Sequence, residues 1–135
     1  MTRRIPRYTY ILVPFLLLGA CTARNNFTEM LEAYESHKAE SIERLLEARV
    51  GPGAVRATIS ARLDKAGAVN RVSVAVLVDH AHGQGANGEV TATPRTLEEM
   101  EAISNLVRAA IGFDETRGDN VEILNVRFFE TIKVK

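Results

Sequence analysis

Two neighbouring stretches of the chain alternate apolar and polar side chains, and this alternation constrains the fold more than any other feature. In AVRATISARLD, apolar residues occupy every second position from Val55 to Leu63. In NRVSVAVLVD, valine occupies every second position from Val72 to Val78. Successive side chains of a strand point to opposite faces, so each stretch predicts a strand with one buried face. The short KAGA segment between them predicts a hairpin turn.

Two other segments carry apolar residues at spacings of three and four, which is the period of an amphipathic helix. The first covers residues 29–50, with Thr28 as its predicted N-cap, and ends at the GPG that follows. The second covers residues 96–111, where Thr96 and Glu99 have the spacing of a capping box. The apolar stripe of the first helix is Phe27, Met30, Leu31, Tyr34, Ile42, Leu45 and Leu46.

The remaining segments complete the order of elements. Gly112 follows the last apolar residue of the second helix, at the position where a left-handed cap favours glycine. Beyond it, VEILNVRFF predicts a third strand, whereas HAHGQGANGEVTATP, rich in glycine and small residues, predicts a loop. The order is therefore helix, strand, strand, helix, strand. The simplest packing is an α+β fold, a three-stranded sheet with two helices on one face.

The N-terminus has the composition of an export signal. Three arginines precede an apolar run, and the run ends in LLGAC at Cys21. This pattern resembles a bacterial lipobox, so residues 1–20 are predicted to be a signal peptide and residues 21–28 a tether behind a lipid-modified cysteine. The alternative is a short transmembrane anchor, although about a dozen apolar residues is short for a span. Cys21 is the only cysteine, so no intramolecular disulfide is possible.

Few residues suggest chemistry. His80 and His82 adjoin Asp79, but His37 is the only other histidine and no second cysteine exists, so no metal site is predicted. The glycine-rich GQGANG lacks the Lys-Ser or Lys-Thr pair of a phosphate loop. The 17 basic and 17 acidic residues include no basic run that would indicate nucleic acid. No catalytic or cofactor-binding residues are predicted, and an enzyme would have to rest on His80 and His82.

Charge is concentrated between the second helix and the third strand, in FDETRGD. An adhesion role for Arg-Gly-Asp needs a flexible exposed tip, and here the tripeptide runs directly into a strand. Aspartate and arginine side chains suit a tight turn held by side-chain hydrogen bonds, so the segment is interpreted as a structural corner. The predicted corner residues are Gly112, Phe113, Asp114, Arg117, Gly118 and Asp119.

Three ordered motifs resemble one known family. VGPGAVRATISARLD at 50–64, RVSVAVLVD at 71–79 and TPRTLEEMEAISNLVRAAIGFDETRGDNVEILNVRF at 93–128 closely resemble the C-terminal periplasmic part of FliF-type flagellar M-ring proteins, at their third ring-building motif. The resemblance implies the same helix-strand-strand-helix-strand fold over residues 29–128, with residues 129–135 as a strand extension or tail. It also implies a structural role without catalysis, because that family builds rings at the bacterial inner membrane.

The chain also departs from that family. Family members carry a long insertion between the hairpin strands, which forms a collar, and here DKAGAVN is expected to make only a turn. Two earlier ring-building motifs, a second transmembrane helix and the cytoplasmic tail that binds the rotor protein FliG have no counterpart in this sequence. The lipobox-like start is more like the related lipoprotein ring of type III secretion systems.

Together these features predict a structural component of a membrane-associated ring in a flagellar or type III secretion basal body, formed by self-association or by docking to other ring proteins. The expected location is the periplasmic side of the bacterial envelope, with the chain held at the membrane through Cys21. A monomeric, lipid-anchored periplasmic binding module with the same fold is the alternative. No cofactor, small-molecule substrate or nucleic acid is expected. The predicted interface residues are Arg56, Arg62 and Leu77 on the sheet and Glu98, Glu101 and Arg108 on the second helix.

Overall fold

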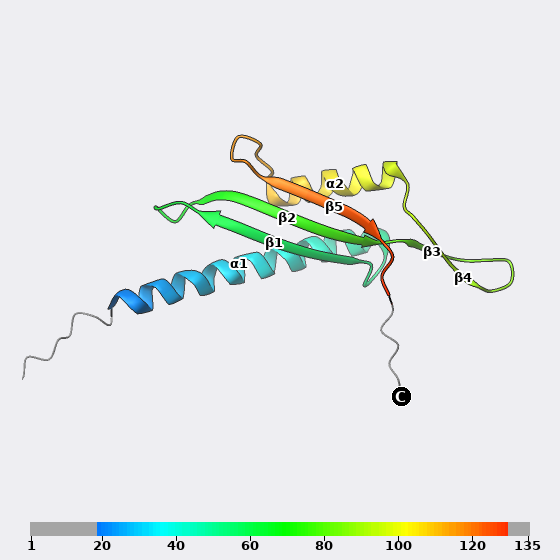
Figure 1. Cartoon of the computed structure of the whole chain (residues 1–135), viewed down its shortest axis with the longest axis horizontal. Coiled ribbons are helices and arrows are strands. Elements are labelled where there is room, and N and C mark those ends of the chain that lie inside the picture. Colours follow the sequence, from blue (N-terminus) through cyan, green and yellow to red (C-terminus); the bar gives the residue numbers. More distant parts are fainter. Residues whose placement is uncertain (1–18, 130–135) are drawn as a thin grey trace, which may run out of the picture.

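The computed structural model describes residues 19–129, with side chains from Asn26 onward; almost all of the predicted signal peptide and C-terminal tail lies outside this range. Along the chain, the elements are α1 (Gly19–Val50), β1 (Val55–Leu63), β2 (Val69–Asp79), β3 (Ala81–Gln84), β4 (Val90–Thr93), α2 (Leu97–Ile111) and β5 (Asn120–Val126) (Figure 1).

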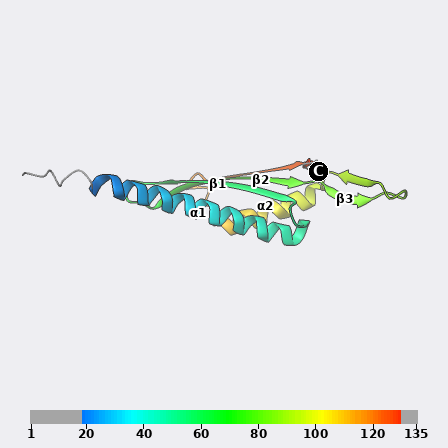
Figure 2. The same cartoon turned by 90° about the horizontal axis from the view of Figure 1, so that it is seen from below.

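The central sheet has the strand order β1–β2–β5. The two alternating stretches, β1 and β2, pair antiparallel as a hairpin, and β5 pairs parallel with β2. Parallel neighbours need a crossover connection, and here that connection contains α2. Both helices lie on the same face of the sheet (Figure 2), so the predicted α+β fold is confirmed.

The first helix is longer than the apolar pattern predicts. The sequence predicts a start near Glu29 with Thr28 as N-cap, but α1 begins at Gly19, which places Thr28 inside the helix and makes residues 21–28 helical. No glycine or proline occurs between Ala20 and Val50 to stop it. Once a helix is nucleated, each added residue costs little, so a polar segment of helix-compatible residues extends it without an apolar stripe.

The segment predicted to be a loop after β2 forms a small second sheet instead. Strands β3 and β4 pair antiparallel, and the turn between them is closed by the Gly85 N–H donating to the Glu89 carbonyl at 2.7 Å. Gly88 has a φ of 76°, which favours glycine at this turn. The strands have four residues each and consist largely of small side chains, so they give too short an alternation to be recognised. This hairpin projects beyond the end of the central sheet (Figure 1).

The hydrophobic core lies between the central sheet and the two helices. The inward faces of β1 and β2 contribute alternate aliphatic residues, as the sequence predicts, and the helices cover them. The buried members of this core are Ile42, Leu46, Val55, Ile59, Val72, Val74, Val76, Val78, Ile103 and Val107. Part of the α1 stripe does not reach this core, since the side chain of Leu45 is 45% exposed and that of Met30 is 61% exposed.

Helix α1 runs along the outer edge of β1 and supplies acceptors to it. The Glu43 carboxylate accepts the Ala57 N–H at 2.8 Å, and the Glu35 carboxylate accepts the Ala61 N–H at 2.7 Å. Eight residues of helix rise about 12 Å and four residues of strand about 13 Å, so the two glutamates are spaced to match the two amides. Side chains of α1 thus occupy hydrogen-bonding positions that a fourth strand would otherwise fill.

Candidate functional site

Local hydrogen bonds close both ends of α2, as its sequence predicts. The Thr96 hydroxyl accepts the Glu99 N–H and the Glu99 carboxylate accepts the Thr96 N–H, so the capping box is confirmed. At the other end, Gly112 is left-handed with φ 62° and ψ 56°, and the Phe113 N–H donates to the Arg108 carbonyl at 2.9 Å. The Arg108 guanidinium lies 4.3 Å from the centre of the Phe113 ring, which is a cation–π contact.

Asp114 organises the turn that follows. Its Oδ1 accepts the Thr116 N–H at 2.9 Å, the Thr116 hydroxyl at 2.6 Å and the Arg117 N–H at 3.3 Å. The hydrogen bond from the Thr116 hydroxyl is the main reason that the pKa of Asp114 is lowered. An aspartate that accepts backbone N–H groups two and three residues ahead is a common way to fix a turn.

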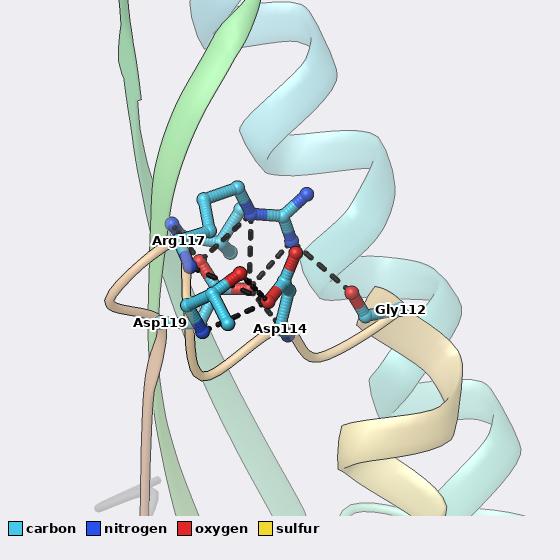
Figure 3. Close-up of polar contacts among 6 residues, drawn as sticks. Gly112, Asp114, Arg117 and Asp119 are labelled. Carbon is cyan, nitrogen blue, oxygen red and sulfur yellow. Dashed lines mark hydrogen bonds and ion pairs between the residues drawn. The ribbon is translucent and has the colours of Figure 1, made fainter.

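Asp119 is the centre of the corner (Figure 3), and its side chain is 0% exposed. It accepts the Val72 N–H at 2.8 Å and the Asp114 N–H at 3.1 Å, and Arg117 binds both of its oxygens. Arg117 also donates to the Gly112 carbonyl at 3.1 Å. The Arg117 hydrogen bonds, aided by the two amides, lower the pKa of Asp119 to about 2 although burial opposes this, and the same pairing raises the pKa of Arg117. Asp119 therefore joins β2 to the corner.

The structure brings together all six predicted corner residues. Gly118, the remaining member, has a φ of 78° and donates its N–H to the Glu115 carbonyl at 3.0 Å. In the Arg-Gly-Asp tripeptide at 117–119, Arg117 pairs with the buried Asp119, so both charged groups are engaged within the fold. The geometry supports a structural role for the corner, which remains a prediction until it is tested.

A second polar cluster lies at the opposite end of the sheet, where β2 ends. Asp79 is buried and accepts the His80 N–H, the Phe128 N–H and His82 Nε2, each at 2.8 Å. Burial favours the neutral acid, but these hydrogen bonds outweigh it and lower the pKa of Asp79. Nearby, the Arg95 side chain is 8% exposed; its Nε donates to the Asp79 carbonyl at 2.8 Å.

The described residues offer neither a metal site nor a membrane-spanning helix. Among residues 26–129, no three histidine, cysteine or carboxylate side chains are grouped closely enough to hold a metal ion. His82 contacts Asp79, and His80 meets it only through its backbone N–H. Within residues 19–129, none of the helices has the length and apolar character needed to cross a bilayer. Cys21 lies in the first turn of α1, in the part where only the backbone is described.

The sheet face away from the helices is open and carries the predicted sheet residues. Arg62 lies directly opposite Arg71 across the hairpin, and both are exposed. Like charges in this position destabilise a sheet, and no carboxylate within residues 26–129 forms an ion pair with either arginine. At the other end of this face, Arg56 lies beside Leu77 and Leu124, which are 39% and 49% exposed. We call this surface the outer sheet face.

The exposed side of α2 has the opposite charge at its start. Leu97 is 76% exposed, and Glu98 and Glu101 follow it on the solvent side. Arg108, in the last turn, makes this end of the helix basic. Strand β1 and helix α2 run in the same direction (Figure 1), so Arg56 and Glu98 lie at one end of the fold, and Arg62 and Arg108 lie at the other.

Sequence reasoning missed Leu124 and Arg95 for different reasons. Leu124, like the predicted Leu77 with which it pairs, is an apolar residue on the polar side of its strand, and this break in the alternation is a usable signal for the outer sheet face. The bonds of Arg95 join residues far apart in the chain, with Nη2 donating to the Val50 carbonyl at 3.2 Å across 45 positions. No local pattern marks such a residue.

The chain is a small α+β domain, a three-stranded sheet with two helices on one face, and it has two exposed surfaces of different charge. The chain belongs to the family described as Flagellar M-ring protein C-terminal, whose model matches residues 55–128. It is 39% identical over 67 residues to the flagellar M-ring protein of Buchnera aphidicola subsp. Schizaphis graminum. It is 35% identical over 72 residues to the flagellar M-ring protein of Pseudomonas aeruginosa. These matches cover 50% and 53% of this chain but only 11% and 12% of the relatives.

Proposed function

We propose that this chain is a structural component of a membrane-associated ring in a flagellar or type III secretion basal body, and that it acts by self-association. Membership of the flagellar M-ring family supports a structural role rather than a catalytic one. The proposed location is the periplasmic side of the bacterial envelope, with the chain attached to the membrane through a lipid on Cys21. Copies of the same chain or other ring proteins are its proposed partners.

The observation that carries this proposal is the complementarity of the outer sheet face and the exposed side of α2. Because β1 and α2 run in the same direction, two copies placed side by side without axial displacement bring Arg56 of one opposite Glu98 of the next. The exposed Leu97 then faces the apolar pair Leu77 and Leu124. Such a contact uses two different patches on each copy, and contacts of this type close into rings when the rotation permits.

Charges at the other end of the fold support the same arrangement. In the same alignment, Arg62 and Arg71 of one copy lie at the level of the corner of the next copy, where Asp114 and Glu115 are exposed. An acidic partner there would relieve the repulsion between the two arginines. Contacts between exposed charges are weak and sensitive to salt. Attachment of many copies to one membrane raises their effective concentration and compensates for weak pairwise affinity.

Cysteine crosslinking in membranes tests the proposal. Arg56→Cys combined with Glu98→Cys should give a ladder of multimers, since each chain then carries both halves of the contact. The matched control combines Arg56→Cys with Arg108→Cys, which moves the second thiol ten residues along α2, about 15 Å away. Each single variant is expected to give a dimer at most, and Cys21 is kept in every variant.

Results that contradict self-association are equally specific. Monomer alone from Arg56/Glu98, and from a second pair at the other end of the contact, Arg62/Glu115, would refute the ring proposal. The protein would then be better described as a monomeric, lipid-anchored binding module. Equal ladders from Arg56/Glu98 and from the control Arg56/Arg108 would instead reject the contact between Arg56 and Glu98. A defined interface crosslinks only thiols that lie close together, and the two α2 positions are more than two helical turns apart.

A further inference from the structure

A cavity lies at the end of the fold where α1 stops and the β3–β4 hairpin begins. It has a volume of about 550 Å³. Residues from the α1–β1 loop, β1, the end of β2, β3, the segment before α2 and the segment after β5 line it. The polar lining side chains are Arg56, Asp79, His80, His82 and Arg95, and Phe128 and Phe129 are its aromatic residues.

The one carboxylate in this lining is engaged within the fold. Asp79 accepts three hydrogen bonds, two from backbone N–H groups and one from His82. Its own carbonyl accepts from Arg95. Because donors within the fold contact both carboxylate oxygens, most of the acceptor capacity of Asp79 is used before a ligand enters the cavity.

The Arg95 guanidinium is held in place by hydrogen bonds, but not all of its N–H groups have an acceptor. Its Nε and Nη2 donate to the Asp79 and Val50 carbonyls, which takes two of the five N–H groups that a guanidinium carries. Within residues 26–129, Nη1 makes no hydrogen bond, and its ion pair with Glu99 Oε1 is 3.9 Å long. The other oxygen of Glu99 is occupied by Thr96. Arg95 therefore presents spare donors on a side chain that is only 8% exposed.

The other polar groups of the lining are donors or cations. Arg56 donates one N–H to the Val55 carbonyl and has its remaining N–H groups free within residues 26–129, with its guanidinium 5.9 Å from the Phe128 ring centre. Phe129 is 90% exposed at the mouth of the cavity. Two arginines against one carboxylate leave the lining net positive, and with the aromatic wall they are complementary to an oxyanion attached to an apolar body.

We propose that this cavity is a binding site for a small oxyanion, a carboxylate or a phosphate, that is carried on an apolar group. Arg95, fixed by two carbonyls, provides the preorganised part of the site, and Arg56 provides the more adaptable part. Phe128 and Phe129 contact the apolar group. Arg56 also belongs to the outer sheet face, but binding requires only a single copy of the chain and can be measured without self-association.

The test measures binding to the full chain purified from membranes in detergent, diluted until it is monomeric. The probes are N-acetylphenylalanine, inorganic phosphate, and N-acetylphenylalaninamide as the uncharged control. The readout is the NMR signal of the Arg95 Nε–H. N-acetylphenylalanine should shift this signal saturably, with a dissociation constant of about 1 mM for a ligand of this size, and phosphate should compete with it. Tighter binding of N-acetylphenylalanine identifies a carboxylate ligand, and tighter binding of phosphate identifies a phosphate ligand.

Variants separate a specific site from general electrostatic attraction. Arg56→Gln should weaken binding about fivefold or more, which is the loss of one charge-assisted hydrogen bond. Arg49→Gln is the matched control, since Arg49 is exposed beside the cavity without lining it, and it should change the affinity less than about twofold. Arg95→Met should abolish binding. If that variant does not fold, Arg56→Gln still tests the proposal.

Three results would overturn the proposal. The first is no saturable shift with either oxyanion up to about 20 mM, well above the affinity expected for such ligands. The second is equal binding of the uncharged amide. The third is equal weakening by Arg49→Gln and Arg56→Gln. None of these outcomes depends on crosslinking, so the failure of this proposal and the failure of ring formation are distinguishable.

Discussion

Replacing the carboxylate of Asp119 is expected to destabilise the fold more than any other single change in the corner. Asp119→Ala removes acceptors from the buried N–H of Val72 and from the N–H of Asp114, and it leaves Arg117 without its partner. An unsatisfied buried donor costs about 1–3 kcal/mol, so the total loss in the free energy of unfolding is expected to be about 3–5 kcal/mol. Asp119→Asn, which keeps one acceptor oxygen, should cost about 2–4 kcal/mol.

The same carboxylate predicts a defined dependence on pH. The pKa of Asp119 falls from 3.8 to about 2 in the fold. A folded pKa below the unfolded one means that the ionised group stabilises the native state above about pH 4, and that this stabilisation is lost as pH falls toward 2. The difference corresponds to about 2 kcal/mol. The wild type should therefore lose about three quarters of this amount relative to Asp119→Asn between pH 4 and pH 2, and most of the remainder below pH 2.

Urea denaturation followed by circular dichroism at pH 7, 4, 3 and 2 measures this effect. Glu115→Gln is the matched control, because Glu115 belongs to the same turn, is exposed and should change stability by less than about 0.5 kcal/mol. A difference between wild type and Asp119→Asn that stays constant from pH 7 to pH 2 would show that the carboxylate does not hold the corner. So would an Asp119→Ala variant as stable as Glu115→Gln.

Two further predictions concern the corner and the N-terminus. Gly112→Val should lower the free energy of unfolding by about 1–3 kcal/mol through backbone strain alone, because φ is 62° and a Cβ would meet no atom within 4 Å. Gly112→Asn should cost less. A thermal melt of Gly112→Val equal to that of the wild type would contradict this. For Cys21, intact-mass analysis of membrane-extracted protein should show loss of residues 1–20 and an added diacylglyceryl group, with Cys21→Ser found soluble. Native protein that keeps Met1 and carries no lipid would refute lipidation.

The features that could be predicted from the sequence are those that neighbouring residues determine. The capping box of Thr96 and Glu99 and the left-handed Gly112 depend on residues within one or two turns, and the structure has both. The alternation of β1 and β2 also sets the buried face of each strand without reference to the rest of the chain. The order of elements and the fold class then followed from packing rules.

The features that could not be predicted depend on residues far apart in the chain. Asp119 bonds to Val72 across 47 positions, so no local pattern shows that its carboxylate joins the corner to β2. Arg95 gains its importance from Val50, at a similar separation. The length of α1 was underestimated because a polar segment without glycine or proline resembles a linker in composition, while its backbone preference is helical.

The glutamates that α1 places along β1 have a consequence for misassembly. An open strand edge accepts strands from other molecules, and this is a common origin of aggregation. The danger increases when many copies fold close together on one membrane surface. In this protein Glu35 and Glu43 occupy N–H groups of the β1 edge, and their negative charge repels a second edge of the same kind. The domain can therefore be crowded at high density while its sheet is protected from growing at β1, so that crowding favours contact between folded faces over aggregation through strands.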